Sequence, residues 1–144
     1  MSRGKYYLDT SIILPYYREE SKSKEVENFL FSLRPPLIIS DLTRVEFASI
    51  LARWVRLEEL SEQQADLIQS TFDQDIHSGL YNASHISSTQ YIIAEKWISR
   101  RNIVLTTIDA LHLACADECE AIFMTCDETL HHAAGALGLK TRLL

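Results

Sequence analysis

Short apolar runs alternate with longer amphipathic segments along most of the chain. The runs at 5–8, 37–39, 121–125 and 140–144 have the length of buried strands, and 80–86 is a weaker candidate. Helical spacing of apolar residues marks the segments between them, at 23–33, from Ser40 or Asp41 onward, from Ser61 towards Ile76, from Ser87 or Ser88 through Ile98, at 107–119 and at 127–137. Strands separated by helices form parallel sheets, because each helix returns the chain to the same end of the sheet. The pattern predicts an α/β domain of three α/β/α layers with a short, mainly parallel central sheet.

Local signals define where several of these helices begin and end. Ser61 with Gln64 three residues on resembles a capping box. Pro35-Pro36 ends the helix at 23–33, and Gly138 ends the helix at 127–137. The helix after Ser40 is predicted to turn one apolar stripe towards the core, made of Leu42, Val45, Ala48, Ala52 and Val55.

The size and composition of the chain are those of one globular domain. It has 144 residues, of which 47% are hydrophobic, and no linker rich in proline or glycine, so we expect 1–144 to form a single domain. Asp9 interrupts what would be the apolar part of a signal peptide, which favours a cytoplasmic protein. The net charge of −6 disfavours binding to phosphates unless the acidic residues serve another purpose, such as metal binding.

Four acidic residues fall where a parallel sheet gathers its functional groups. Asp9 and Asp127 directly follow predicted strands, whereas Glu46 and Asp109 lie near the starts of predicted helices. Strand ends and the starts of the following helices share one edge of such a sheet, so the four acids can converge. Converging carboxylates stay ionised together only with a compensating cation, and all-oxygen ligands suit Mg²⁺ or Mn²⁺. The alternative is that each is a solvated acid or, for Asp109 and Asp127, an acid that stabilises a helix start.

Four segments contain these acids: Tyr7-Leu8-Asp9-Thr10-Ser11, Ser40-Asp41-Leu42-Thr43-Arg44-Val45-Glu46, Asp109-Ala110-Leu111-His112-Leu113-Ala114 and Met124-Thr125-Cys126-Asp127. In order and spacing they resemble the signatures of the PIN-domain ribonuclease family, in particular the VapC-type toxins. The resemblance runs from about Tyr6 to the C-terminus. It implies a PIN-like fold and a metal-dependent endoribonuclease that hydrolyses RNA phosphodiester bonds with Mg²⁺ or Mn²⁺.

The resemblance also assigns roles to individual residues. It implies that Asp9, Glu46, Asp109 and Asp127 are the catalytic residues and metal ligands, with Asp9 and Asp109 holding the principal ion. Hydroxyl groups beside these acids are predicted to orient them, or else to form turns and caps, and they belong to Thr10, Ser11 and Thr125. Basic side chains predicted to contact RNA phosphates, with solubility as the alternative, are Arg44, Arg53, Lys96, Arg100 and Arg101.

The resemblance further implies partners, namely an RNA substrate, a small antitoxin protein and a second copy of the chain in a homodimer. A surplus of apolar residues on the central helices (Ile50, Leu57, Leu60, Leu67) favours a dimer or a partner helix, with a thick core as the alternative. Many relatives carry an arginine shortly before the third acid, where this chain has Thr106-Thr107-Ile108. This departure concerns substrate handling more than metal binding.

The sequence also bears on functions other than that of a nuclease. A PIN fold could serve mainly as an RNA- or protein-binding module with little or no catalytic activity. A haloacid-dehalogenase-like phosphatase needs a second Asp where Ser11 stands, and the paired acids and lysine of a receiver-type domain are not evident. His112, Cys115 and Cys119 share a helix face, but one helix rarely supplies a closed zinc site. We therefore expect reduced cysteines and a packed helix histidine.

Overall fold

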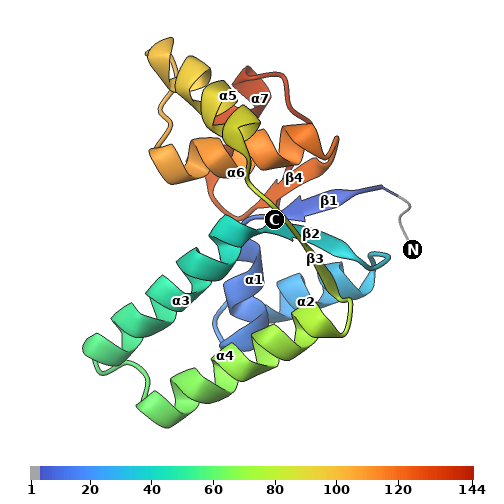
Figure 1. Cartoon of the computed structure of the whole chain (residues 1–144). Helices are drawn as coiled ribbons and strands as arrows, with labels where there is room; N and C mark the ends of the chain where they lie inside the picture. The colour runs from blue at the N-terminus through green and yellow to red at the C-terminus, as the bar shows by residue number, and fades with distance from the viewer. Residues whose placement is uncertain (1–3) are drawn as a thin grey trace.

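The computed structural model describes residues 4–144 and places a parallel sheet between two layers of helices (Figure 1). Its five strands are β1 (Tyr6–Leu8), β2 (Leu37–Ser40), β3 (Tyr81–Ser84), β4 (Ile122–Thr125) and β5 (Thr141–Leu143). They lie in the order β3-β2-β1-β4-β5, and every neighbouring pair is parallel. The predicted α/β/α architecture is confirmed, and the central position of β1 brings Asp9 to the middle of the sheet edge.

Seven helices connect and cover these strands within the described residues: α1 (Thr10–Tyr17), α2 (Ser23–Phe31), α3 (Asp41–Arg56), α4 (Glu62–His77), α5 (Ser88–Ser99), α6 (Thr107–Glu118) and α7 (Glu128–Ala136). The sequence predicted all but α1. That helix contains Pro15 and buries Ile12 and Ile13, so it has neither an uninterrupted backbone ladder nor a polar face that marks a helical period. The capping box at Ser61 is confirmed.

The two faces of the sheet carry separate cores, because successive side chains of a strand point to opposite sides. On one face Leu8 and Ile39 pack with residues of α1 to α4. On the other face Tyr7 and Phe123 pack with Trp97 of α5 and with residues of α6 and α7. Figure 1 shows α5, α6 and α7 on one side of the sheet and α1, α2 and α4 on the other. No helix within residues 4–144 is long and apolar enough to cross a membrane.

The stripe by which α3 packs on the core differs from the predicted one. Thr43, Phe47 and Leu51 are its buried residues, whereas Val45 is 67% exposed. The Phe47 ring stacks on Phe72 of α4 with ring centroids 4.1 Å apart. The aromatic pair buries more apolar area than the smaller Val and Ala side chains could, and it sets the rotation of α3. That rotation places Glu46 beside the buried face rather than on the solvent side.

Candidate metal centre

Asp9 is held at the end of β1 by several hydrogen-bond donors. Its side chain caps α1, and its Oδ1 accepts a bond from the Thr10 backbone N–H at 2.8 Å. Its Oδ2 accepts bonds from Ser11 Oγ at 2.7 Å and from Thr125 Oγ1 at 2.9 Å. Only 7% of the residue is exposed. These bonds fix the orientation of a nearly buried carboxylate at the carboxyl-terminal edge of a parallel sheet.

Glu46 approaches Asp9 from the second turn of α3. Its Oε1 accepts hydrogen bonds from the Thr10 hydroxyl and from His112 Nε2, the latter at 3.0 Å. Burial raises the pKa of Glu46, but the bonds from His112 and Thr10 outweigh burial and hold the pKa below its usual value. Ligand atoms of Asp9, Glu46 and His112 all lie within 4.8 Å of one another. These three residues form a group that could hold a metal ion.

Asp109 lies in the first turn of α6, as predicted, and the charges of other acids affect its pKa. Its backbone N–H donates to Oγ1 of Thr106, the N-cap of the helix, at 3.2 Å. Burial raises the pKa of the Asp109 carboxyl, and the negative charges of Asp9 and Asp127 raise it further, against the lowering effects of Thr106 and His112. Asp109 therefore shares an electrostatic environment with these two acids, although it is outside the 4.8 Å group.

Asp127 follows β4 and caps α7. Its Oδ1 accepts hydrogen bonds from the backbone N–H groups of Thr129 and Leu130, at 2.9 Å and 3.2 Å. Its own N–H donates to Oγ1 of Thr125 at 3.0 Å, and the same hydroxyl donates to Asp9. Asp127 therefore stabilises the start of α7, in agreement with the alternative prediction of a helix-start acid. The Thr125 hydroxyl links the ends of β1 and β4 into one network.

Comparison with known proteins places this arrangement in a family. The model of the family described as "PIN domain" matches residues 6–136, which is nearly the whole chain. The chain belongs to the PIN domain family. A search of curated proteins found no match for the sequence.

Solved structures share the fold of this PIN domain at low sequence identity. FitAcB from Neisseria gonorrhoeae is 18% identical, with a TM-score of 0.77 over 94% of this chain and 95% of that one. VapC20 from Mycobacterium tuberculosis, described as a toxin that cleaves the sarcin-ricin loop, is 15% identical, with a TM-score of 0.72 over 94% and 96%. VapBC-1 from nontypeable Haemophilus influenzae is 15% identical, with a TM-score of 0.70 over 96% of both chains. At these identities the similarity supports the fold.

Within residues 4–144, no lysine or arginine forms an ion pair with any of the four acids of this PIN domain, and Glu46 pairs with His112. The negative charges of Asp9 and Asp127 contribute to the raised pKa of Asp109, and a divalent cation stabilises a carboxylate in such an environment. Oxygen donors fit Mg²⁺ or Mn²⁺ well. The donor set therefore fits a hard divalent ion.

The predicted RNA-contacting residues lie on α3, on α5 and just after α5. Arg44 lies 3.9 Å from Asp73 of α4, and Lys96 and Arg100 line a shallow depression at the end of α5. Arg53 and Arg101 are exposed. Thr106 caps α6, so this residue has a local structural role. The predicted contacts to RNA stay predictions.

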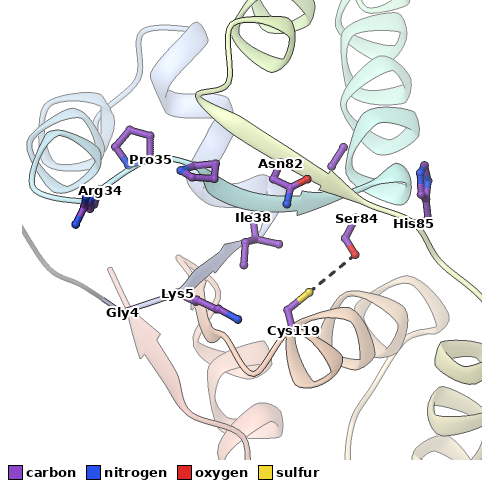
Figure 2. A pocket seen from close by; sticks show the side chains of 11 residues that line it. Gly4, Lys5, Arg34, Pro35, Ile38, Asn82, Ser84, His85 and Cys119 are labelled. Atoms are coloured by element: carbon purple, nitrogen blue, oxygen red, sulfur yellow. Dashed lines mark hydrogen bonds between the residues drawn. The ribbon is translucent and has the colours of Figure 1, made fainter.

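A separate groove lies on the sheet face beside β2 and β3 (Figure 2). It has a volume of about 650 Å³ and is lined by Lys5, Arg34, Asn82 and Cys119 among others, and none of the four acids contributes to its lining in the described part of the chain. The Cys119 thiol lies 3.9 Å from Ser84 Oγ across this groove, as Figure 2 shows. Cys119 thus turns away from the candidate metal centre, and no group of His112 with cysteines forms within residues 4–144.

Besides the acids, His112 also lies at the candidate metal centre. It is a packed helix histidine, as expected, with 0% exposure, yet it also contacts Glu46. A signal was present, since a residue three positions after Asp109 on α6 lies on the same side of the helix. Helical spacing predicts that His112 and Asp109 lie on the same side of α6. The contact between His112 and Glu46 depends on how α6 packs against α3, which helical spacing does not specify.

The raised pKa of Asp109 predicts a stability change. The folded, metal-free protein binds a proton at Asp109 more tightly than the unfolded chain does, so the charged carboxylate destabilises the fold at neutral pH. This penalty fades as the pH falls through the raised pKa towards the ordinary value of 3.8. Asp109→Asn is therefore expected to raise the melting temperature of metal-free protein at neutral pH, with a smaller gain at low pH. An Asp109→Asn protein that melts below wild type at neutral pH would contradict this.

Proposed function

We propose that this PIN domain, comprising 1–144, is a Mg²⁺- or Mn²⁺-dependent endoribonuclease and the toxin of a type II toxin–antitoxin system. The observation that carries the proposal is the buried Asp9 carboxylate, which is held by three donors beside Glu46 and forms no ion pair with a cationic side chain among residues 4–144. Asp9, Glu46, Asp109 and Asp127 are the proposed catalytic residues and metal ligands. The proposed site of action is the cytoplasm.

The chemistry of the proposed reaction is hydrolysis of an RNA phosphodiester bond. A divalent ion held by the four acids would lower the pKa of a bound water and stabilise charge on the phosphate. Ser11 and Thr125 orient Asp9 through hydrogen bonds to its Oδ2, and Thr10 orients Glu46. These hydroxyls keep the carboxylate oxygens in fixed positions before any ion binds, which reduces the reorganisation that binding requires.

Known structures of the same fold support the toxin assignment. VapC20 is described as a toxin that cleaves the sarcin-ricin loop. Other solved structures of this fold include FitAB bound to a DNA fragment and VapBC from Salmonella typhimurium bound to DNA. By analogy we propose that a small antitoxin protein is the partner of this chain and that RNA is its substrate. Proposed contacts to RNA phosphates are made by Arg44, Arg53, Lys96, Arg100 and Arg101.

A bound ion should stabilise the protein against heat. A ligand present at 100 times its Kd stabilises the folded state by about 2.7 kcal/mol. We expect millimolar Mn²⁺ or Mg²⁺ to raise the melting temperature of protein previously stripped of metal, as measured by scanning calorimetry. Asp9→Asn should lose most of this shift. A wild-type melting temperature that neither ion changes would argue against the site.

The exposed apolar residues of α3 and α4 favour self-association. Leu57 is 55% exposed and Leu67 is 68% exposed, whereas Leu60 packs against the core. We propose a homodimer that covers Leu57 and Leu67, because removing exposed apolar side chains from water favours association. Light scattering should give twice the 16.5 kDa of one chain, and Leu57→Glu with Leu67→Glu should give a monomer. A wild-type mass of one chain at all concentrations would contradict the dimer.

A further inference from the structure

A chain of buried hydrogen bonds lies behind Glu46. His112 Nε2 is 3.0 Å from Glu46 Oε1, and His112 Nδ1 is 2.7 Å from the Tyr7 hydroxyl. That hydroxyl is in turn 2.8 Å from Ser40 Oγ. Tyr7, Ser40 and His112 each have 0% exposure. Residues of β1, β2 and α6 are therefore joined through His112 to a carboxylate on α3.

The direction of the bond between His112 and Glu46 follows from the chemistry of the two groups. An ionised carboxylate only accepts hydrogen bonds, so the Nε2 atom must carry the hydrogen. The Tyr7 hydroxyl donates its one hydrogen to Ser40 Oγ, so the bond between Tyr7 and His112 Nδ1 is donated by Nδ1–H. Both ring nitrogens therefore donate, Nε2–H to Glu46 and Nδ1–H to Tyr7.

Both ring nitrogens of His112 are thus engaged by protein groups. A histidine binds a metal ion through the lone pair of an unprotonated nitrogen. Neither nitrogen offers one, since Nε2 carries a hydrogen directed at Glu46 and Nδ1 faces the Tyr7 hydroxyl inside the core. To become a ligand, His112 would have to give up its bond to Glu46 or Tyr7. Either loss would leave a polar group with too few partners.

We propose that His112 is a positioning residue that holds Glu46 through Nε2–H and does not bind the metal ion itself. The inference rests on the proposed function, because Glu46 must be a ligand of that site. It excludes the other reading of the group of Asp9, Glu46 and His112, in which the imidazole joins the ion directly. The consequence is a site with oxygen ligands from the protein, suited to Mg²⁺ or Mn²⁺.

Two substitutions of similar shape separate the two hydrogen bonds of His112. The amide NH₂ of Gln occupies the place of Nε2 and can still donate to Glu46, whereas the amide of Asn reaches only the place of Nδ1. Mn²⁺ affinity, measured from the electron paramagnetic resonance signal of free Mn²⁺, should stay close to wild type in His112→Gln. It should fall roughly 10- to 100-fold in His112→Asn, the range typical for groups that orient metal ligands.

Control measurements exclude a general loss of structure. The melting temperature of each metal-free variant reports on folding, and His77→Gln, on the exposed end of α4, controls for the loss of a histidine. If His112 were a ligand, both substitutions would weaken binding, and Zn²⁺ affinity would fall more than Mn²⁺ affinity. Equal Mn²⁺ affinity in wild type and His112→Asn would overturn the positioning role.

A spectroscopic measurement distinguishes the inference from the proposed function. Pulsed electron paramagnetic resonance of Mn²⁺-loaded wild-type protein should show no coupling to a directly bound nitrogen. A strong nitrogen coupling, lost in His112→Gln, would overturn the inference while leaving the metal-dependent nuclease intact. If wild type binds no Mn²⁺ at all, both proposals fail. If it binds Mn²⁺ as inferred but cleaves no RNA, the nuclease activity in the proposed function fails, whereas its metal site and the inference about His112 stand.

Discussion

Asp9→Asn is expected to reduce Mn²⁺-dependent RNA cleavage on the order of 10³-fold or more, because an activated water supplies much of the rate of a metal hydrolase. Asn keeps the shape of Asp but removes one negative charge from the proposed ligand. Asp9 is the best-held carboxylate of the site, with bonds from Thr10, Ser11 and Thr125. Its loss should therefore affect ion binding more than the loss of a less ordered acid.

The fold should survive this substitution. The Ser11 and Thr125 hydroxyls, which donate to the carboxylate, can rotate to accept from the Asn amide. A matched control is Asp41→Asn at the start of α3, where Asp41 lies 2.9 Å from His85 Nδ1. Single-turnover cleavage of RNA should be nearly unchanged in Asp41→Asn. Equal loss of cleavage in the two variants would show that a general effect of charge, rather than metal ligation, is responsible.

Phe47→Ala is expected to destabilise the protein by about 3–5 kcal/mol, the usual effect of removing a buried aromatic ring. Phe47 is fully buried and stacks on Phe72, and its ring also contacts Tyr17 edge-to-face with centroids 5.6 Å apart. This loss is a large part of the roughly 5–15 kcal/mol by which a typical domain is stable. Because Phe47 follows Glu46 on α3, the variant should also lose metal affinity.

Val45→Ala on the same helix is the control, since Val45 is 67% exposed. Urea unfolding should place it within about 0.5 kcal/mol of wild type, as for other surface substitutions. The apolar stripe predicted from the sequence would give the opposite ranking, with Val45 in the core. A larger loss of unfolding free energy for Val45→Ala than for Phe47→Ala would contradict the observed packing of α3.

The sequence predicted the sheet and the edge at which the acids lie, because strand ends are marked by short apolar runs. Asp9 and Asp127 were located in this way: Asp9 directly follows β1, and Asp127 lies two residues after the end of β4. Two features of the site depend on tertiary packing and could not be predicted from the sequence. The rotation of α3 depends on the contact between Phe47 and Phe72, and the role of His112 depends on how α6 lies against α3. The spacing of residues along one helix does not predict either of these contacts between helices.

The hydroxyl groups near the acids show the same difference between what the sequence predicts and what tertiary packing determines. Thr10, Ser11 and Thr125 were identified because they are adjacent to the acids in sequence, and all three hydrogen-bond to Asp9 or Glu46 in the structure. Their adjacency did not specify the partners. Thr10 bonds through its side chain to Glu46, 36 residues away, rather than to its neighbour Asp9. The contacts arise because β1 and the start of α3 meet at one sheet edge.

The most direct test of the proposed function is cleavage of a mixed pool of structured RNA by purified wild-type protein, stripped of metal and then supplied with Mn²⁺. The account predicts cleavage that requires the ion, that is lost in Asp9→Asn, and that accompanies growth arrest in a host without the antitoxin. If wild type and Asp9→Asn leave the RNA equally intact and are equally harmless in cells, the nuclease proposal is wrong. The protein would then be a PIN-fold binding module.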